Sequence, residues 1–418
     1  MTVISELRMQ ASAEPTLRDG WDASLRARVA LTGAVMGLLF IGVNIATPIY
    51  PVLQAKLGLG PLGVTVAFTA YVLALIVGLL CYGHWSDHIG RRAALVLAVV
   101  LALAGGLVFA FAPSLTFLVI GRVLQGAAVA AATGASSAAL RELMPRHPDW
   151  AGRFTLLLNA GGVAAGPVVG GALSQLPDPT TTPFLIHSVA LVLVLVPLWL
   201  VRARPALAPA PGRAREALRP RPPKLAREAL VQFWIAALTG LLSFALFGLV
   251  LSLAPGYLGS VFGIDSPLLL GVIAALTLAS SAASQLVGRA TPAVIGPALI
   301  VMGLGTVALA YGAHLESLPV VVAGSIVAGA AQGLAFRGAF NDASAAIPAA
   351  LQAQVTSLIY LVTYLGSAVP VLLLGFVAGR IGMDASFGYF SAGMLACCVA
   401  LAAVAAARHR RLRARAAR

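Results

Sequence analysis

The chain has 418 residues, of which 60% are hydrophobic and 10% charged, and its formal net charge at pH 7 is +14. A soluble protein averages about 25% charged residues, so this composition excludes a soluble globular protein and indicates a chain whose solvent is mostly lipid. No basic patch is interleaved with stacking aromatic residues, so the positive charge does not predict nucleic-acid binding. We expect the basic residues to meet the membrane surface and to set topology.

Residues 1–28 form a polar, arginine-containing tail without the apolar core and small-residue cleavage site of a cleaved signal peptide. A helix needs about 20 apolar residues to cross the hydrocarbon core. Twelve suitable runs follow the tail, at residues 29–53, 61–83, 93–112, 115–140, 153–175, 184–201, 229–253, 267–288, 294–313, 318–341, 353–376 and 386–407. They lack the period-two alternation of barrel strands, which predicts an all-α polytopic membrane protein with twelve transmembrane helices.

A basic, proline-containing stretch at residues 202–228 separates two halves of six spans each, 29–201 and 229–407, and a basic tail follows at 408–418. We expect this stretch to be a solvated linker with a short surface helix. Arginines and lysines gather in the tails, the linker and alternate loops, so both termini and the linker are predicted to be cytoplasmic, in a multi-pass protein of the cell membrane.

The two halves share a weak internal repeat. Residues 121–126, Gly-Arg-Val-Leu-Gln-Gly, align with residues 324–329, Gly-Ser-Ile-Val-Ala-Gly, 203 residues further along the chain. Repeats of this kind build transporters whose site lies between the halves at the membrane midplane. Chance similarity between helices rich in glycine and alanine is the alternative.

Three cysteines, Cys81, Cys397 and Cys398, lie within or at the ends of apolar runs. No Cys-x-x-Cys pair, histidine cluster, paired carboxylates, serine elbow or phosphate-binding glycine loop accompanies them. We therefore expect no metal, no cofactor and no enzyme activity.

The stretch Gly83-His84-Trp85-Ser86-Asp87-His88-Ile89-Gly90-Arg91-Arg92 lies between the second and third spans and fits the pattern Gly-x-x-x-Asp-x-x-Gly-Arg-Arg. Gly83 and Gly90 permit a tight turn. Asp87 is expected to accept bonds from the start of a neighbouring helix. Arg91 and Arg92 would hold the loop in the cytoplasm and pair with acids or lipid phosphate. A simple basic turn is the alternative.

Arg122 lies about a third of the way into the fourth span. A bare charge there costs about 2.5–3.5 kcal/mol on insertion scales, so we expect it to face a central cavity and to have partners. Gln125 and Gly126 lie on nearly the same side. The alternative role for Arg122 is a structural hydrogen-bond anchor.

The fifth span contains the glycine- and proline-containing stretch 162–171, with Gly162, Gly166, Pro167, Gly170 and Gly171. Glycines permit close helix packing and proline bends a helix. Pure packing and a helix that bends during transport are both open interpretations.

These three stretches resemble motifs of the major facilitator superfamily. The stretch 83–92 is similar to its loop 2–3 signature, residues 122–126 to its Arg-x-x-Gln-Gly motif, and residues 162–171 to the Gly-x-x-x-Gly-Pro-x-x-Gly-Gly motif that accompanies proton-driven drug antiporters of twelve or fourteen helices. His88 and Trp85 depart from the usual basic residue and leucine. The corresponding loop at 288–292 lacks the acid, so we expect a latch in one half only.

Few other charges lie within the spans. Arg337 and Asp342 belong to the tenth span but are five residues apart, which is not an ideal helical contact, so we treat them as separate candidates. The first span offers Asn44 but no acid. Asp342 and Asp87 are therefore the candidates for proton coupling, with a simple interfacial position as the alternative for Asp342.

Polar and aromatic residues near mid-span describe an apolar cavity with a few hydrogen-bonding groups: Asn44, Tyr71, Gln125, Phe244, Phe247, Gln332, Phe336, Tyr360 and Tyr364. Such a cavity suits amphiphilic or moderately hydrophobic molecules.

The leading hypothesis is a monomeric secondary active exporter of small, drug-like molecules that works by alternating access and proton influx. A sugar or metabolite exporter, or a uniporter, of the same fold without proton coupling is the alternative, and the missing acid in the first span favours it. A transport-inactive sensor or a membrane enzyme is a remote third hypothesis.

Overall fold

The structure is a computed structural model that describes residues 3–7, 20–202, 230–288, 291–347 and 352–416. Twelve helices within these residues are long and apolar enough to cross a membrane. A β-bridge between Trp21 and Val201 is the only strand-type pairing in the described part of the chain. The predicted all-α fold with twelve spans is thereby confirmed.

The described residues form two compact units. The first unit contains those of 1–46 and 70–221, and the second those of 47–69 and 222–418. The predicted linker, apart from Arg202, lies outside the described residues. The predicted boundaries at 29–201 and 229–407 stay predictions. Residues 47–69 belong to the second unit, where the short helices η1 (Thr47–Ile49) and α3 (Tyr50–Leu57) pack on α12 and α13.

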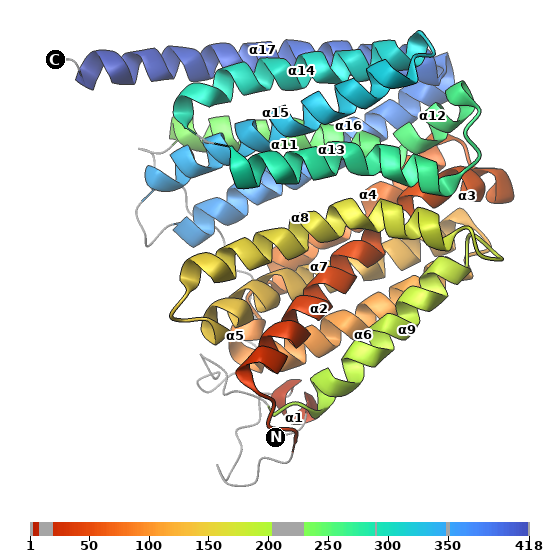
Figure 1. Cartoon of the computed structure of the whole chain (residues 1–418), viewed down its shortest axis with the longest axis vertical. Helices are drawn as coiled ribbons and strands as arrows, with labels where there is room; N and C mark the ends of the chain where they lie inside the picture. Colours follow the sequence, from red (N-terminus) through yellow and green to blue (C-terminus); the bar gives the residue numbers. More distant parts are fainter. Residues whose placement is uncertain (1–2, 8–19, 203–229, 289–290, 348–351, 417–418) are drawn as a thin grey trace. The chain divides into compact units, whose positions relative to one another are not determined.

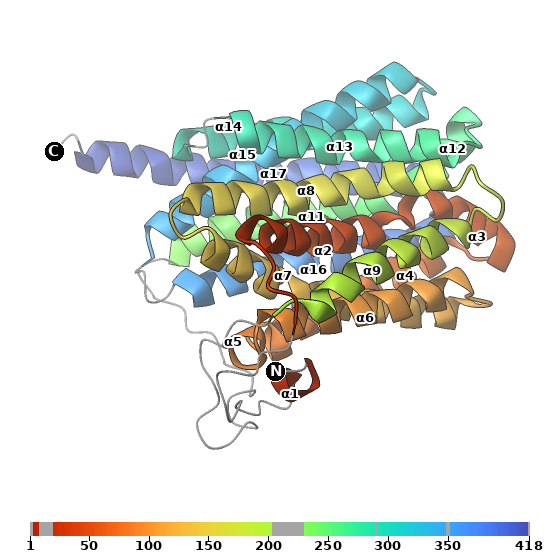
Figure 2. The same cartoon turned by 60° about the horizontal axis from the view of Figure 1, so that its bottom comes forward.

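The first unit is built of helices around an aliphatic core. They are α1 (Val3–Leu7), α2 (Leu25–Asn44), the later part of α4 (Pro61–Tyr82), α5 (Ser86–Ile89), α6 (Arg91–Ala110), α7 (Leu115–Leu143), α8 (Pro148–Leu173) and α9 (Thr182–Leu200). α2 lies beside α8 (Figure 2), and α6 packs on both α7 and α9. Val35 of α2, Leu95 of α6 and Leu191 of α9 are among the buried core residues.

The second unit contains η1, α3, the start of α4 and the remaining helices. These are α11 (Leu230–Ser252), α12 (Ala254–Phe262), α13 (Pro267–Val287), α14 (Pro292–His314), α15 (Leu318–Ala345), α16 (Gln352–Ile381) and α17 (Met383–Ala416). α14 runs alongside α15 and α17 (Figure 1). α11 packs on α16, and Met302 of α14 and Ile359 of α16 belong to the same buried core of this unit.

The predicted repeat has a counterpart in packing. In the first unit, a Cβ on Gly121 of α7 would lie 2.9 Å from the carbonyl oxygen of Gly105 in α6. In the second unit, a Cβ on Gly324 of α15 would lie 2.9 Å from the carbonyl oxygen of Gly305 in α14. Glycines therefore bring together equivalent pairs of helices, α6 with α7 in the first unit and α14 with α15 in the second, because they allow backbones to approach closely.

Candidate functional site

Residues 83–92, which we call the signature loop, are held against α7 by small residues and by Tyr82. Gly90 has a φ of +90°, which favours glycine. A Cβ on Gly134 of α7 would lie 3.0 Å from the carbonyl oxygen of Gly83, so the loop approaches that helix closely. The hydroxyl of Tyr82 donates to the carbonyl of Ala127 at 3.1 Å. These contacts determine the position of Asp87, Arg91 and Arg92 relative to α7.

Arg91 is the centre of a polar group that we call the signature cluster, made of Ser86, Asp87, Arg91 and Glu142. Its Nη1 lies 2.6 Å from the Asp87 carboxylate and donates to the Ser86 hydroxyl at 2.5 Å. Its Nη2 lies 2.9 Å from Glu142 Oε1. Because Arg91 is the first residue of α6, the partner that we expected for Asp87 at the start of a neighbouring helix is a guanidinium side chain.

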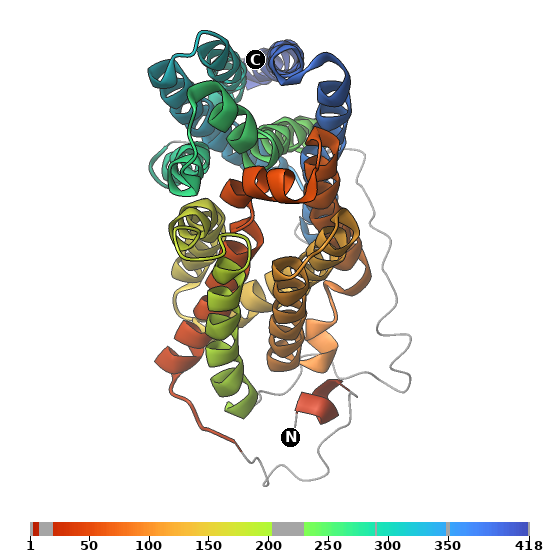
Figure 3. The same cartoon turned by 90° about the vertical axis from the view of Figure 1, so that its right-hand side faces the viewer.

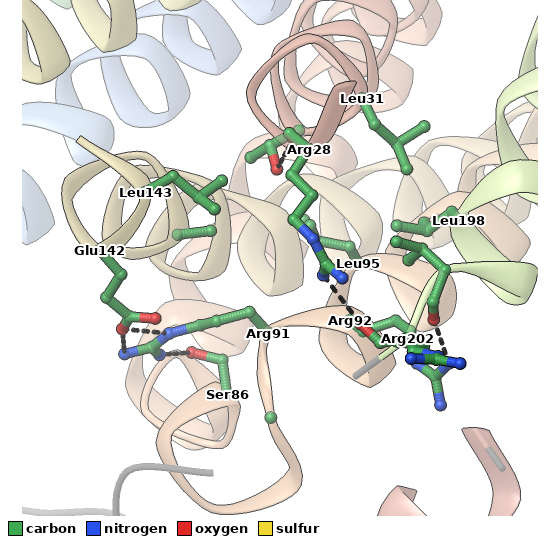
Figure 4. A pocket seen from close by; sticks show the side chains of 14 residues that line it. Arg28, Leu31, Ser86, Arg91, Arg92, Leu95, Glu142, Leu143, Leu198 and Arg202 are labelled. Atoms are coloured by element: carbon green, nitrogen blue, oxygen red, sulfur yellow. Dashed lines mark hydrogen bonds and ion pairs between the residues drawn. The ribbon is translucent and has the colours of Figure 1, made fainter. Parts of the chain in front are cut away.

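A cavity of about 80 Å³ lies beside this cluster (Figure 4). Arg28, Arg91, Arg92 and Arg202 line it, together with apolar side chains of α2, α6, α7 and α9. These guanidinium groups already donate to oxygens of the first unit. Arg28 donates to the carbonyl of Arg202 at 2.8 Å, and Arg202 donates to the carbonyl of Gly20 at 2.9 Å. The arrangement is therefore a polar joint between helix ends, with its guanidinium groups hydrogen-bonded.

Arg92 points away from the signature cluster and meets the N-terminal helix. Its guanidinium forms a two-point pair with the Glu6 carboxylate, with Nη2–Oε1 at 2.6 Å and Nε–Oε2 at 3.1 Å. The same group donates to the carbonyls of Val201 and Trp199 at the end of α9. Burial raises the pKa of the Glu6 carboxyl above its usual value, and the bond and charge of Arg92 oppose that rise.

Arg122 of α7 is 1% exposed and satisfies the expectation of partners for a charge within the membrane. Its Nη1 donates to the carbonyl of Val43 in α2 at 2.6 Å and to Oε1 of Gln125 at 2.9 Å. Its guanidinium carbon lies 4.9 Å from the ring centroid of Tyr71 in α4. Gly126 packs directly on the backbone of Tyr71. These contacts join three helices around one charge, within a single unit.

The glycine- and proline-containing motif lies in α8, with Gly162, Gly166, Pro167, Gly170 and Gly171. Gly162, Gly166 and Gly170 are on the face towards α2. A Cβ on Gly162 would lie 2.8 Å from Phe40 Cβ, and a Cβ on Gly166 would lie 2.5 Å from Asn44 Cβ. Pro167 lies inside the helix. These contacts are the close helix packing that one of the two interpretations of the motif requires.

Six aromatic rings gather in the second unit, on α11, α15 and α16. We call them the aromatic cluster: Phe244, Phe247, Phe336, Phe340, Tyr360 and Tyr364. The contacting ring centroids are separated by 5.3 to 6.4 Å, the range in which aromatic pairs attract one another. All six side chains are partly exposed. Gly240 makes room for Phe336 because a Cβ there would lie 3.0 Å from its ring.

The remaining candidates lie elsewhere. The buried amide of Asn44 donates to the carbonyl of Phe40 at 2.9 Å, within α2. Gln332 is buried against α13, where Ser281 donates to it. In this structure the Asn44 amide thus bonds within its own helix, and the Gln332 amide links α15 to α13.

Arg337 and Asp342 have separate partners, as expected from their spacing. Arg337 donates to the carbonyls of Gln285 and Gly288 at the end of α13, where helix carbonyls are otherwise unsatisfied. Asp342 forms an ion pair with Arg408 of α17, and both side chains are mostly buried. Residues 289 and 290 of the loop between α13 and α14 lie outside the described residues.

Sequence reasoning missed several partners of the predicted residues: Glu6, Glu142, Ser281, Phe340 and Arg408. Signals for two of them were present. Phe340 follows Phe336 by four residues, which places both rings on one helix face. Glu142 is an acid at the end of the fourth span, and Arg91 needed one. Glu6 and Arg408 lie in segments that read as solvated tails, and their partners are distant in the chain.

Comparisons with known proteins agree with this architecture. A sequence model described as the Major Facilitator Superfamily matches residues 32–370. The uncharacterized MFS-type transporter Rv1877 of Mycobacterium tuberculosis is 26% identical over 280 residues, which are 66% of this chain and 37% of that relative. The tetracycline resistance protein, class E, of Escherichia coli is 31% identical over 143 residues, which are 32% of this chain and 34% of that relative. The chain thus spans well under half the length of these curated relatives.

A solved structure shares the fold. It is the bacterial homolog of the human lysosomal transporter Spinster, in an inward-facing and unoccupied conformation. The TM-score is 0.72 and the sequence identity is 15%, over 91% of this chain and 95% of that chain. At this identity the likeness concerns the fold alone.

Proposed function

Because this chain belongs to the Major Facilitator Superfamily and is a multi-pass membrane transporter, we propose that it exports small hydrophobic or amphiphilic molecules across the cell membrane in exchange for protons. Alternating access of two six-helix halves would carry the substrate past a site at the membrane midplane. The monomer is the proposed working form.

The aromatic cluster carries this proposal. Six partly exposed rings on three helices offer flat, polarizable surfaces for a molecule with aromatic or aliphatic faces. A sugar or a highly charged metabolite would instead need several hydrogen-bonding groups at its site. The drug-resistance name of one relative agrees with the cluster, although that likeness covers a third of the chain.

We propose that the signature cluster is part of a latch, by which we mean contacts that help to keep the cytoplasmic side of the transporter closed. The basic residues around it favour the cytoplasmic side, with both termini there as well. Arg91 ties the loop to α7 through Glu142, so the loop and α7 would move together.

Proton coupling is assigned to Asp87 or Asp342. Each carboxylate pairs with an arginine on another helix, Arg91 of α6 or Arg408 of α17. Protonation of either acid would remove the charge from its pair and loosen one helix contact, which is how a proton can bias a conformational equilibrium.

Transport by the purified chain in proteoliposomes tests the proposal. We expect uptake of a planar aromatic dye such as ethidium, or of tetracycline, when an imposed pH gradient drives protons out of the liposomes. Phe336→Ala should raise KM by about fivefold, because it removes three ring contacts. Phe117→Ala, at an exposed position of α7 outside the cluster, is the matched control. No substrate-dependent proton movement across a broad panel would contradict antiport.

A sugar or metabolite transporter, or a uniporter, without proton coupling is the second candidate. One observation favours it: α2, the first span, contains no acid, and its Asn44 is engaged with its own helix. Uptake of D-xylose that survives dissipation of the pH gradient, together with no movement of the aromatic dyes, would support this candidate over the first.

A further inference from the structure

The N-terminal helix α1 is bound to the first unit more firmly than a chain end usually is. The first residues of a domain are poorly ordered unless something ties them down. Here Val3 is 1% exposed and packs in the core of the first unit, while its neighbour Ile4 is 52% exposed. Figure 3 shows this short helix beside the N mark at one end of the first unit. Glutamate is rarely buried unless it is paired, yet Glu6 is 5% exposed.

The partner of Glu6 explains the binding. Arg92 bonds the carboxylate at two points and also donates to carbonyls at the end of α9. A guanidinium that bonds both a carboxylate and helix-end carbonyls is held in one position, and the carboxylate balances its charge. Arg92 adjoins Arg91, the centre of the signature cluster. Arg92 is therefore the one residue that connects Glu6 to the signature cluster.

We propose that α1 is a positioning element of the latch, in which Glu6 fixes Arg92 and so keeps the ends of α6 and α9 together while the transporter changes conformation. This inference rests on the proposed transport function. Acting through Arg92, Glu6 affects the rate of the conformational change and leaves substrate affinity unaltered.

Two opposing contributions act on the docked Glu6 carboxylate, its burial and its pairing with Arg92. Burial of a carboxylate is costly, and a buried ion pair often fails to offset that cost. The raised pKa of the Glu6 carboxyl reports the same balance, since the effect of burial exceeds that of Arg92.

Thiol labelling tests whether Glu6 holds α1. Cysteine is introduced at Val3 or, as the matched control, at Ile4 in the full chain, and a maleimide reaction is followed on the N-terminal peptide because Cys81, Cys397 and Cys398 also react. Val3→Cys should react about tenfold more slowly than Ile4→Cys, and adding Glu6→Gln should bring the two rates within about twofold. Equal rates with Glu6 intact, or no change with Glu6→Gln, would overturn the proposal.

Transport by the same proteins tests the positioning role. Glu6→Gln should lower Vmax about fivefold with KM unchanged, and Glu6→Asp, which keeps the carboxylate, should recover part of the rate. An unchanged Vmax, or a loss that appears in KM, would overturn the proposal. If the parent chain moves no probe, the proposed function fails, while the labelling rates still decide whether Glu6 holds the helix. Protein that elutes as a single species from size exclusion ensures that misfolding is not measured.

Discussion

The two units have glycines at equivalent helix contacts, but different side chains lie between those glycines. Gly121 and Gly126 of α7 pack on α6 and α4, and the equivalent Gly324 and Gly329 of α15 pack on α14 and α13. Between these glycines the units differ. Arg122 in the first unit corresponds to Ser325 in the second, and each is 1% exposed.

The same helix shows the opposite difference further along. Phe336 and Phe340 of the second unit correspond, at the same offset of 203 residues, to Thr133 and Ser137 of the first. All four side chains are partly exposed. One unit thus places a charge, and the other places aromatic rings, on a helix frame of similar packing. Repeated small residues specify how helices approach, and the residues between them are left to diverge for function.

The largest effect is expected when Arg122 receives the residue of its counterpart. Arg122→Ser removes the guanidinium that joins α7 to Val43 of α2 and to Tyr71 of α4. We expect transport in proteoliposomes to fall by about 100-fold or more, because a buried network fails when its central group is lost. The chain should still insert, since a serine within a span costs less than a bare charge.

Ser325→Ala is the control for this exchange, as it changes the equivalent position without removing a charge. It should keep transport within about twofold of the parent, the range of ordinary substitutions away from a site. If Arg122→Ser transported at the parental rate, the chemical difference between α7 and α15 would have no role.

Stability should respond equally in the two units when the glycines are changed. A Cβ on Gly126 would overlap the backbone of Tyr71, and a Cβ on Gly329 would overlap that of Thr277. Gly126→Ala and Gly329→Ala should each lower the free energy of unfolding by about 1–3 kcal/mol, as overpacking does, measured as a lower apparent Tm in detergent. Gly161→Ala, whose nearest neighbour lies 3.9 Å away, should leave Tm unchanged. A loss in one unit only would break the equivalence.

The sequence predicted the frame because composition and glycine spacing are local properties. Twelve apolar runs, the repeat at 121–126 and 324–329, and the buried environment of Arg122 all follow from stretches that can be assessed singly. Partners were harder. Glu6 and Arg92 are 86 residues apart, and Asp342 and Arg408 are 66 apart. Pairing across such distances is set by helix packing, which no local pattern encodes.

The latch should be sensitive in the first unit alone. Asp87 is 47% exposed and pairs with Arg91, and Asp384 of the second unit is 55% exposed and lies 3.1 Å from Nδ1 of His314. Asp87→Asn should lower Vmax about tenfold, which corresponds to a coupling energy of about 1.4 kcal/mol. Asp384→Asn, matched in exposure and in having a basic partner, should leave Vmax within about twofold. Similar losses in both variants would indicate that any exposed ion pair matters, and the signature cluster would lose its special role.

The smallest effect is expected at the edge of the aromatic cluster. Phe340→Ser gives α15 the residue that α7 carries at the equivalent position, and it removes ring contacts to Phe336 and Tyr360. Two such contacts are together worth about 1–3 kcal/mol in a packed core and less at a partly exposed site, so KM for an aromatic substrate should rise about threefold. Combining Phe340→Ser with Phe336→Ala should raise KM by less than the product of the separate effects, because the rings share a contact. Multiplying effects would mean that the substrate meets each ring independently, and the cluster would then be a row of separate contacts instead of one surface.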